Sequence, residues 1–301
     1  MTISRAQLAK ELEPGLNALF GLEYDRYENE AAEIFESEGS DRAFEEEVML
    51  SGFGTAPVKS EGSAINFDDA QETYTARYTM ETIALAFSIT EEAVEDNLYD
   101  RLAARYTRAL ARSMAQTKQI KGATVLNNAF STASPIGDGA ALCSAAHPSL
   151  SGDQSNLLAT PADLNETSLE DILIQIAGFT DERGLKIAVR GTKLLIPKEL
   201  QFIAERIINS NLRPGSADND INAMKSMGML PEGAVVNHFF TDADAYFVKT
   251  DCPNGFKLFN RTPLKTAMEG DFDTGNMRFK ARERYAFGVS DWRCVFGTPG
   301  A

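Results

Sequence analysis

The stretch from Ser88 to Phe130 constrains this chain more than any other part of the sequence. It contains no proline, and its first glycine is Gly122. Acidic residues crowd its start and basic residues follow, which complements the macrodipole of a helix. Ser88 and Glu91 have the spacing of a capping box. Apolar residues recur at helical spacing, and those predicted to share one buried face are Val94, Leu98, Leu102, Tyr106, Ala109, Leu110, Ile120 and Thr124. The pattern predicts one amphipathic helix over residues 88–130.

A helix of that length needs a structural reason, because the average helix in a globular protein has about 11 residues. A coiled coil is one reason, but the apolar positions do not keep a strict heptad, and Ser113 and Thr117 interrupt them. We therefore expect a spine helix, meaning a long rod along which the rest of a domain packs.

The 301 residues suffice for one large domain or two modest ones. No apolar run approaches the 18 residues or so of a membrane span, and no signal peptide opens the chain. We expect neither membrane insertion nor secretion by that route. The cysteines, Cys143, Cys252 and Cys294, are odd in number and far apart. This predicts a reducing compartment and no disulfide framework.

The negative charge is concentrated in the first third of the chain. Residues 1–100 carry 6 Lys or Arg and 23 Asp or Glu, a net charge of -17, whereas the whole chain has -15. Such a balance argues against a general nucleic-acid-binding protein. One interpretation is a soluble acidic surface, and the other is an acidic segment that docks on basic surfaces of a neighbouring copy.

The first 50 residues predict two short helices separated at Pro14-Gly15, followed by an acidic segment over residues 23–47. Apolar residues in that segment are too sparse for an independent core. We therefore expect an arm that becomes ordered on its own body or on a neighbour.

Residues 72–89 predict an extended run whose apolar residues change face. They occupy even positions up to Met80 and odd positions from Ile83 onward. A regular strand cannot change face, so we expect a bulge or twist near Glu81–Thr82. A strand is also expected to begin at Ile65 and Phe67. The outer half would form a two-stranded ribbon, which is marginally stable alone and therefore implies a partner surface.

The rest of the chain predicts an α+β protein in two lobes. Residues 131–161 read as a packed loop. A helix capped by Thr167 or Ser168 and closed by Gly184 buries Leu169, Ile172, Leu173, Ile176 and Phe179. A second helix starts at Pro197. Strands are expected at residues 186–189, 193–196, 234–240, 245–249, 255–260, 263–269, 276–287 and 289–296.

The candidate catalytic residues are few. Cys143 and His147 form the one nucleophile–base pairing on offer, and a small hydrolase using them on an α+β scaffold is the alternative function. The preferred interpretation of His147 is a structural histidine that caps a loop. The cysteine spacing fits no zinc site, so we expect neither metal nor cofactor. The row Arg101, Arg105, Arg108 and Arg112 is either a solvated helix face or a contact for acidic arms or packaged nucleic acid.

Several motifs, in their order along the chain, resemble the major capsid proteins of tailed phages. The motifs are GFG-x-A-x-V-K-x-E-G from Gly52, Phe87 to Asn97 before the long helix, Lys121-Gly-Ala123, the Cys143-Ser-Ala-Ala-His147-Pro loop with Gly152 and Ser155-Asn156, and the strand Gly191 to Pro197. The resemblance is greatest to the Mu-like prophage major head subunit group, within the Hong Kong 97-type fold.

This resemblance implies a division of the chain into an arm, a loop and two domains. The parts are an N-terminal arm (1–50), an extended β loop (51–87), a peripheral domain with the spine helix (88–165, completed by about 263–286), and an axial domain (166–262, completed by about 287–301). On this basis we expect deletion of residues 1–45 to spare folding and stop assembly.

The resemblance also implies a function and partners. Such proteins assemble as pentamers and hexamers into an icosahedral shell around double-stranded DNA, bound without sequence specificity. The expected partners are copies of the chain, a separate scaffolding protein, a portal and an optional decoration protein, with no membrane. The expected location is the virion, after assembly in the host cytoplasm. The residues expected at assembly contacts are Phe53, Lys59, Phe67, Tyr74, Tyr78, Arg101, Arg105, Arg108 and Arg112.

Overall fold

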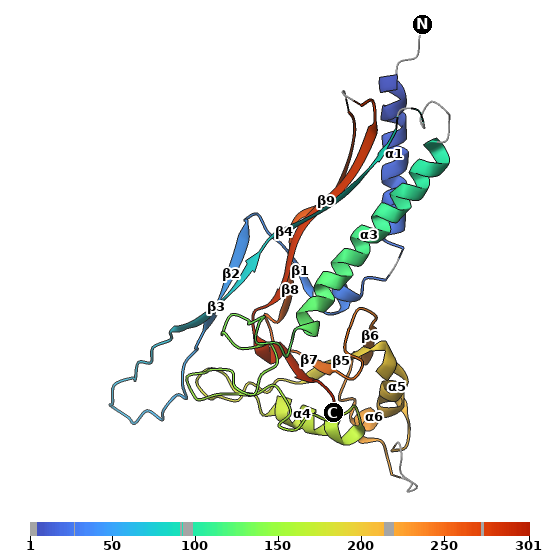
Figure 1. The fold of residues 1–301 in the computed structure, drawn as a ribbon. Coiled ribbons are helices and arrows are strands. Elements are labelled where there is room, and N and C mark those ends of the chain that lie inside the picture. Colours follow the sequence, from blue (N-terminus) through green and yellow to red (C-terminus); the bar gives the residue numbers. More distant parts are fainter. Residues whose placement is uncertain (1–4, 27, 91, 93–98, 214–219, 272–273) are drawn as a thin grey trace.

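A computed structural model describes residues 5–26, 28–90, 92, 99–213, 220–271 and 274–301, with the backbone alone for residues 5–14 and 99–102. The chain forms an elongated lobe and a rounder lobe, and a long loop projects beside them (Figure 1).

The elongated lobe is built on a four-stranded sheet with the order β1–β8–β9–β4. Its strands are β1 (Glu36–Gly39), β8 (Phe256–Gly270), β9 (Met277–Val289) and β4 (Glu81–Ile89). β9 pairs antiparallel with β8 and β4, and β1 pairs parallel with β8. Helices α1 (Arg5–Tyr24) and α3 (Tyr99–Asn127) run along this sheet (Figure 1). Leu16, Phe20, Leu110 and Met114 meet Phe279 there in one buried cluster.

The predicted spine helix exists, but it is shorter and turned relative to the prediction. Ser88 and Ile89 belong to β4 rather than to the helix, and Glu91, Val94 and Leu98 lie outside the described residues. The side chains that α3 buries are those of Ala103, Thr107, Leu110, Ala111, Met114, Ala123 and Leu126. Of the predicted face with described side chains, Leu110 alone is buried; Ala109 and Thr124 are exposed, as are Tyr106 (51%) and Ile120 (47%).

The physical reason is close packing. Small side chains let neighbouring segments approach α3, and a Cβ added at Gly122 would lie 3.0 Å from the Cβ of Ala31. The larger residues of the pattern are therefore left on the outside of the rod.

Helix α1 continues through Pro14-Gly15, so the predicted break between two short helices is wrong. An internal proline removes one backbone hydrogen bond and costs roughly 3 kcal/mol. Leu16 and Phe20, which follow the proline, are 7% and 1% exposed. Burying such side chains contributes about 1.5–3 kcal/mol each, which offsets the cost of the proline.

The acidic arm becomes ordered on its own subunit, one of the two expected outcomes. A 3-10 helix, Glu30–Glu33, leads into β1. Ala31, Ile34 and Phe35 are 0–4% exposed within a core that also contains Phe256 and Tyr285. Removing residues 1–45 would open this core, so the structure leads us to expect that the deletion impairs folding as well as assembly.

The ribbon consists of β2 (Phe44–Leu50) and β3 (Glu72–Thr79), paired antiparallel. The chain leaves this pair at Met80 and continues as β4 in the other sheet. The predicted change of face is confirmed, one residue before Glu81. Residues 51–71 between the strands contain no helix or strand, so the strand expected at Ile65 and Phe67 does not form.

The rounder lobe contains a second four-stranded sheet with the order β10–β7–β5–β6. Its strands are β10 (Val295–Thr298), β7 (Tyr246–Thr250), β5 (Gly191–Pro197) and β6 (Ala234–Asn237). Helices α4 (Glu166–Ala177), α5 (Gln201–Asn209) and α6 (Ala223–Met227) cover one face, where Leu194, Ile196 and Tyr246 join their core. The other face, with Leu195 and Phe247, packs against the C-terminal part of α3 and the arm.

Several predicted boundaries in this lobe change. α4 buries Leu169, Ile172, Leu173 and Ile176 as predicted, and the fifth predicted residue, Phe179, is buried just beyond its end. Asn165 caps the helix through the amide of Ser168, and Gly178 ends it. Residues 186–189 make one isolated bridge at Lys186 instead of a strand. The strands expected at 255–260 and 263–269 are one strand, β8, because its pairing with β9 continues across irregularities at Thr262. A 3-10 turn, Trp292–Cys294, shortens the last predicted strand to β10.

Candidate assembly surfaces

The loop of residues 51–71, called here the projecting loop, extends beside the two lobes (Figure 1). It leaves large apolar side chains in solvent. Val58 is 99% exposed, Phe67 97%, Ile65 70% and Phe53 61%. Lys59 is exposed between them. Scattered exposed apolar residues need no explanation, but several on one segment indicate a contact surface.

The base of the projecting loop is fixed to the rounder lobe by Asp68. One carboxylate oxygen accepts the Gly54 amide at 2.7 Å, and the other accepts Nη2 of Arg183 at 2.6 Å. Arg183 lies in a turn held by Asp181, whose side chain accepts two backbone amides. The Gly54 hydrogen bond and then Arg183 lower the pKa of Asp68. No sequence motif singled out this pair, because its partners are 115 residues apart.

Two predicted contact residues on the ribbon are used within their own subunit. Tyr78 is 3% exposed, its ring lies against Gly288, and its hydroxyl pairs with Ser290. The Tyr74 hydroxyl donates to the Ser290 carbonyl at 3.3 Å, and the side chain is half-buried. Even-numbered residues of β3 point toward the body, so Tyr74 and Tyr78 serve contacts within the subunit.

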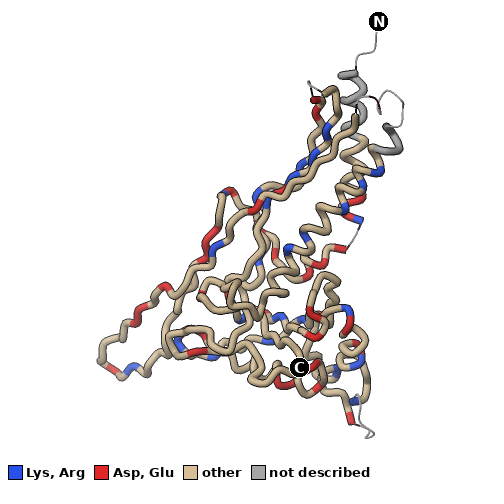
Figure 2. The backbone as a smooth tube through the Cα atoms, in the orientation of Figure 1, with Lys and Arg blue, Asp and Glu red and all other residues tan. Residues whose placement is uncertain are grey.

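The arginine row lies on the solvent side of α3. Arg105, Arg108 and Arg112 are exposed, and the side chain of Arg101 is outside the described part. Figure 2 shows acidic residues along the ribbon and basic residues along β9 and α3, whereas both signs occur on the rounder lobe. The separation of charge is therefore local to the ribbon and the elongated lobe.

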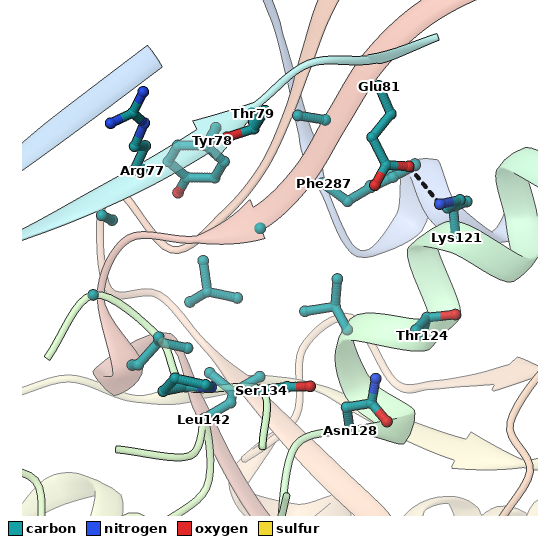
Figure 3. A pocket seen from close by; sticks show the side chains of 18 of the residues that line it. Arg77, Tyr78, Thr79, Glu81, Lys121, Thr124, Asn128, Ser134, Leu142 and Phe287 are labelled. Carbon is teal, nitrogen blue, oxygen red and sulfur yellow. Dashed lines mark hydrogen bonds and ion pairs between the residues drawn. The ribbon is translucent and has the colours of Figure 1, made fainter. Parts of the chain in front are cut away.

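A cavity of about 590 Å³ lies where the ribbon, α3 and β9 meet. Arg77 and Tyr78 lie on one side of it, Lys121 and Glu81 pair at another, and Asn128 and Ser134 lie below (Figure 3). Its described lining contains no cysteine or histidine. The cavity therefore offers no Cys–His pair to a substrate.

The Cys143–His147 pairing required by a hydrolase does not form. His147 is fully buried and stacks on Trp292 with a centroid distance of 4.4 Å. Its Nδ1 lies 2.6 Å from Asp138, and its Nε2 lies 3.0 Å from Asn156 Oδ1. Burial raises the pKa of the Cys143 thiol, which disfavours the thiolate. The histidine thus holds the 138–156 loop, as the structural interpretation predicted.

Asn156 is the centre of that loop, a role that the sequence did not reveal. Its Nδ2 donates to the carbonyls of Leu142, Trp292 and Val295, and its Oδ1 accepts the Ser144 amide. Within the described ranges, no cluster of His, Cys, Asp and Glu could hold a metal ion, and no helix is long and apolar enough to cross a membrane.

The chain matches one known protein family over most of its length. The family model described as phage capsid protein matches residues 73–297, about three-quarters of the chain. The chain belongs to the phage capsid protein family. A search of curated protein sequences gives no significant match.

Solved capsid structures share the fold of this family member. The chain is similar to the capsid of an empty GTA particle (13% identity, TM-score 0.57, covering 89% of this chain and 88% of that one). It is also similar to the virus-like particle from Pyrococcus furiosus (8% identity, TM-score 0.54, covering 94% of this chain and 97% of that one). The chain is likewise similar to the capsid of Myoviridae phage XM1, with 12% identity and a TM-score of 0.53, covering 89% of this chain and 89% of that one. At such low identity these likenesses establish the fold, which is the predicted Hong Kong 97 type.

The capsid family and this fold identify a major capsid protein, a structural subunit of a self-assembling shell and a component of the virion. They give no support to the alternative small hydrolase.

Proposed function

We propose that this chain forms pentamers and hexamers of an icosahedral shell around double-stranded DNA, with the projecting loop lying on neighbouring subunits. The exposed apolar side chains of residues 53–67 carry this proposal, because they are not buried within the subunit and a contact with a neighbour would remove them from water. Phe53, Phe67 and the adjacent Lys59 are the contacts proposed for the loop. Obligate interfaces of shells commonly bury more than 2,000 Å² in total, and a loop without its own core adds area at little cost to the fold.

The proposed domains follow the two sheets. The lobe of α3 and the β1–β8–β9–β4 sheet is the proposed peripheral domain, and the lobe of α4–α6 is the proposed axial domain, whose loops meet at the capsomer centre. The sheet order supports a loop that ends at Met80 rather than at 87, because β4 belongs to the peripheral sheet.

Further partners are proposed from the same family relationship. They are a scaffolding protein, a portal and an optional decoration protein, with assembly in the host cytoplasm and DNA packaged without sequence specificity. Arg105, Arg108 and Arg112 are proposed contacts for acidic segments or phosphate, because all are exposed on α3. Membership of the Mu-like group rests on the quoted motifs. The absence of catalytic activity is supported by the separate roles of Cys143 and His147.

The test replaces the apolar loop residues by serine. A Val58→Ser, Phe67→Ser double variant should keep the wild-type unfolding temperature, since both side chains are already in solvent. It should lose capsomers and particles in sedimentation velocity and negative-stain microscopy. Ala64→Ser, in the same exposed loop, is the matched control and should assemble normally. Normal particles from the double variant would refute the loop's role.

A further inference from the structure

Helix α5 presents an aromatic side chain that its own subunit leaves uncovered. Phe202 is 71% exposed, although Ala204 and Ile207 on the same helix are buried. Arg206 follows one turn later, is exposed, and donates from Nε to the Phe202 carbonyl at 3.1 Å. A ring and a guanidinium thus lie one turn apart on the same helix, and phenylalanine and arginine are both enriched at protein interfaces.

A socket lies beside α4. It is a cavity of about 390 Å³ lined by residues 158–162, which are small or apolar, and by Thr167, Asp171 and Gln175 of the helix. Asp171 is exposed at its rim, and Ile174, 70% exposed, lies next to Gln175 on the outer side of α4. The apolar part of the socket is formed by Leu158, Ala159, Pro161 and Ala162, and polar side chains of residues 160–175, Asp171 among them, form the rest.

The protruding ring and the socket lie toward opposite edges of the same sheet. α5 packs against β6, which is one edge strand. The socket's loop is tied to β10, the other edge strand: Leu157 bridges Gly297, and the Ala162 amide donates to Thr298 Oγ1 at 3.5 Å. Figure 1 shows α4 and α5 apart on the face that they share. One copy therefore cannot fill its own socket.

We propose that Phe202 of one copy inserts into the α4 socket of a second copy of this chain, with Arg206 facing Asp171. The contact deepens the proposed shell function and rests on it. Charge favours this direction at the two paired positions, because contact at Arg206 between two α5 faces would bring like charges together, and so would contact at Asp171 between two α4 faces. A head-to-tail contact between unlike surfaces gives a ring when the rotation from copy to copy closes on itself, which is the case that pentamers and hexamers require.

The first test removes the ring. Phe202→Ala should leave the thermal unfolding of the subunit unchanged and raise the protein concentration needed for assembly by about tenfold or more. Phe202→Leu keeps an apolar side chain and should assemble nearly as well as the wild type. Equal assembly by Phe202→Ala and the wild type would overturn the contact while leaving the shell function intact.

The second test exchanges the charges. Arg206→Asp and Asp171→Arg each place like charges together, and each should impair ring formation measured by native mass spectrometry and sedimentation. The double variant should recover most of the assembly, whereas unconnected sites would give two additive losses. A double variant no better than either single one would overturn the pairing. A wild-type chain that never assembles would instead remove the proposed function, and this contact with it.

Discussion

Lys257 Nζ lies 3.1 Å from Glu38 Oε1, and it also pairs with Glu47, so one nearly buried lysine of β8 joins β1 to β2. Lys193 Nζ lies 2.9 Å from Glu33 Oε2, and Lys249 Nζ donates to the Ile34 carbonyl at 2.9 Å. Three body lysines thus hold the acidic arm. Three carboxylates of this segment, those of Glu33, Glu38 and Glu47, are therefore paired within the same subunit.

Lys257→Met should lower the free energy of unfolding by about 2 kcal/mol, because two carboxylates lose their partner at a site 6% exposed. Burial alone lowers the pKa of Lys257, but Glu47 and Glu38 outweigh it and raise the pKa above its usual value. A raised lysine pKa gives stability that is fully present below the unfolded value and is lost only above it. The difference in unfolding free energy between the wild type and Lys257→Met should therefore be constant between about pH 6 and pH 9 in urea titrations.

Lys280→Met is the control for that measurement. Its 3.9 Å pair with Glu269 is exposed on both sides, and removing it should change stability by at most about 0.5 kcal/mol. Equal effects of the two substitutions would show that the arm is not held as described.

Asn156→Ala should destabilise the subunit by about 2–4 kcal/mol, because it removes the side-chain partner of the Ser144 amide and of the Leu142 and Val295 carbonyls, while the Trp292 carbonyl keeps the Val295 amide. His147 stacks on Trp292, the single tryptophan, so the change should also alter tryptophan fluorescence in the native state. Chemical unfolding followed by fluorescence measures both. An Asn156→Ala protein with wild-type stability and emission contradicts the central role of this side chain.

Gly288→Ala should destabilise by about 1–3 kcal/mol, since the new Cβ would lie 2.5 Å from Tyr78 Cε1 and push the ribbon away from β9. Gly270→Ala, also in a strand but with no atom within 4 Å of the added Cβ, is the matched control. Thermal unfolding should separate the two variants. A tolerated Gly288→Ala would mean that the ribbon is not fixed at Tyr78.

Asp68→Asn should free the projecting loop without affecting the core, because it weakens the link to Arg183 and Gly54. Hydrogen exchange at the Gly54 amide, normalised for intrinsic rates, should be several-fold faster, whereas Asp69→Asn should resemble the wild type. The lowered pKa of Asp68 means that its contribution is present above its unfolded value of 3.8 and fades as the pH falls below it. Wild type and Asp68→Asn should therefore converge at low pH; a persistent difference would point to another cause.

The spine helix and the change of face after β3 were predictable because both depend on spacing within a short segment. Leu169 to Phe179 show the same: five apolar residues at helical spacing are all buried. The buried face of α3 was not predictable in this way. That face includes Ala103, Ala111 and Ala123 beside larger residues such as Leu110 and Met114. Whether a small residue or Tyr106 faces inward depends on how closely α1 and β9 approach.

The predicted assembly residues also differ in whether their exposure depends on local sequence or on distant contacts. Phe53, Lys59 and Phe67 are exposed as a loop of that composition implies, whereas Tyr78 is enclosed by Gly288, which lies 210 positions later in the sequence. Phe202 carried no signal, since an aromatic residue in a short helix is more often buried than exposed.

The sequence by itself determined the α+β class, the long helix, the extended run that changes face, and the order of motifs that resembles capsid proteins, because local spacing and chain order are properties of the sequence. Only the tertiary structure decided which side of α3 is covered, that the acidic arm is held by Lys193, Lys249 and Lys257, and that Phe202 and the α4 socket lie toward opposite edges of one sheet. These depend on contacts between residues far apart in the chain, and such contacts are settled by packing, which no local pattern records.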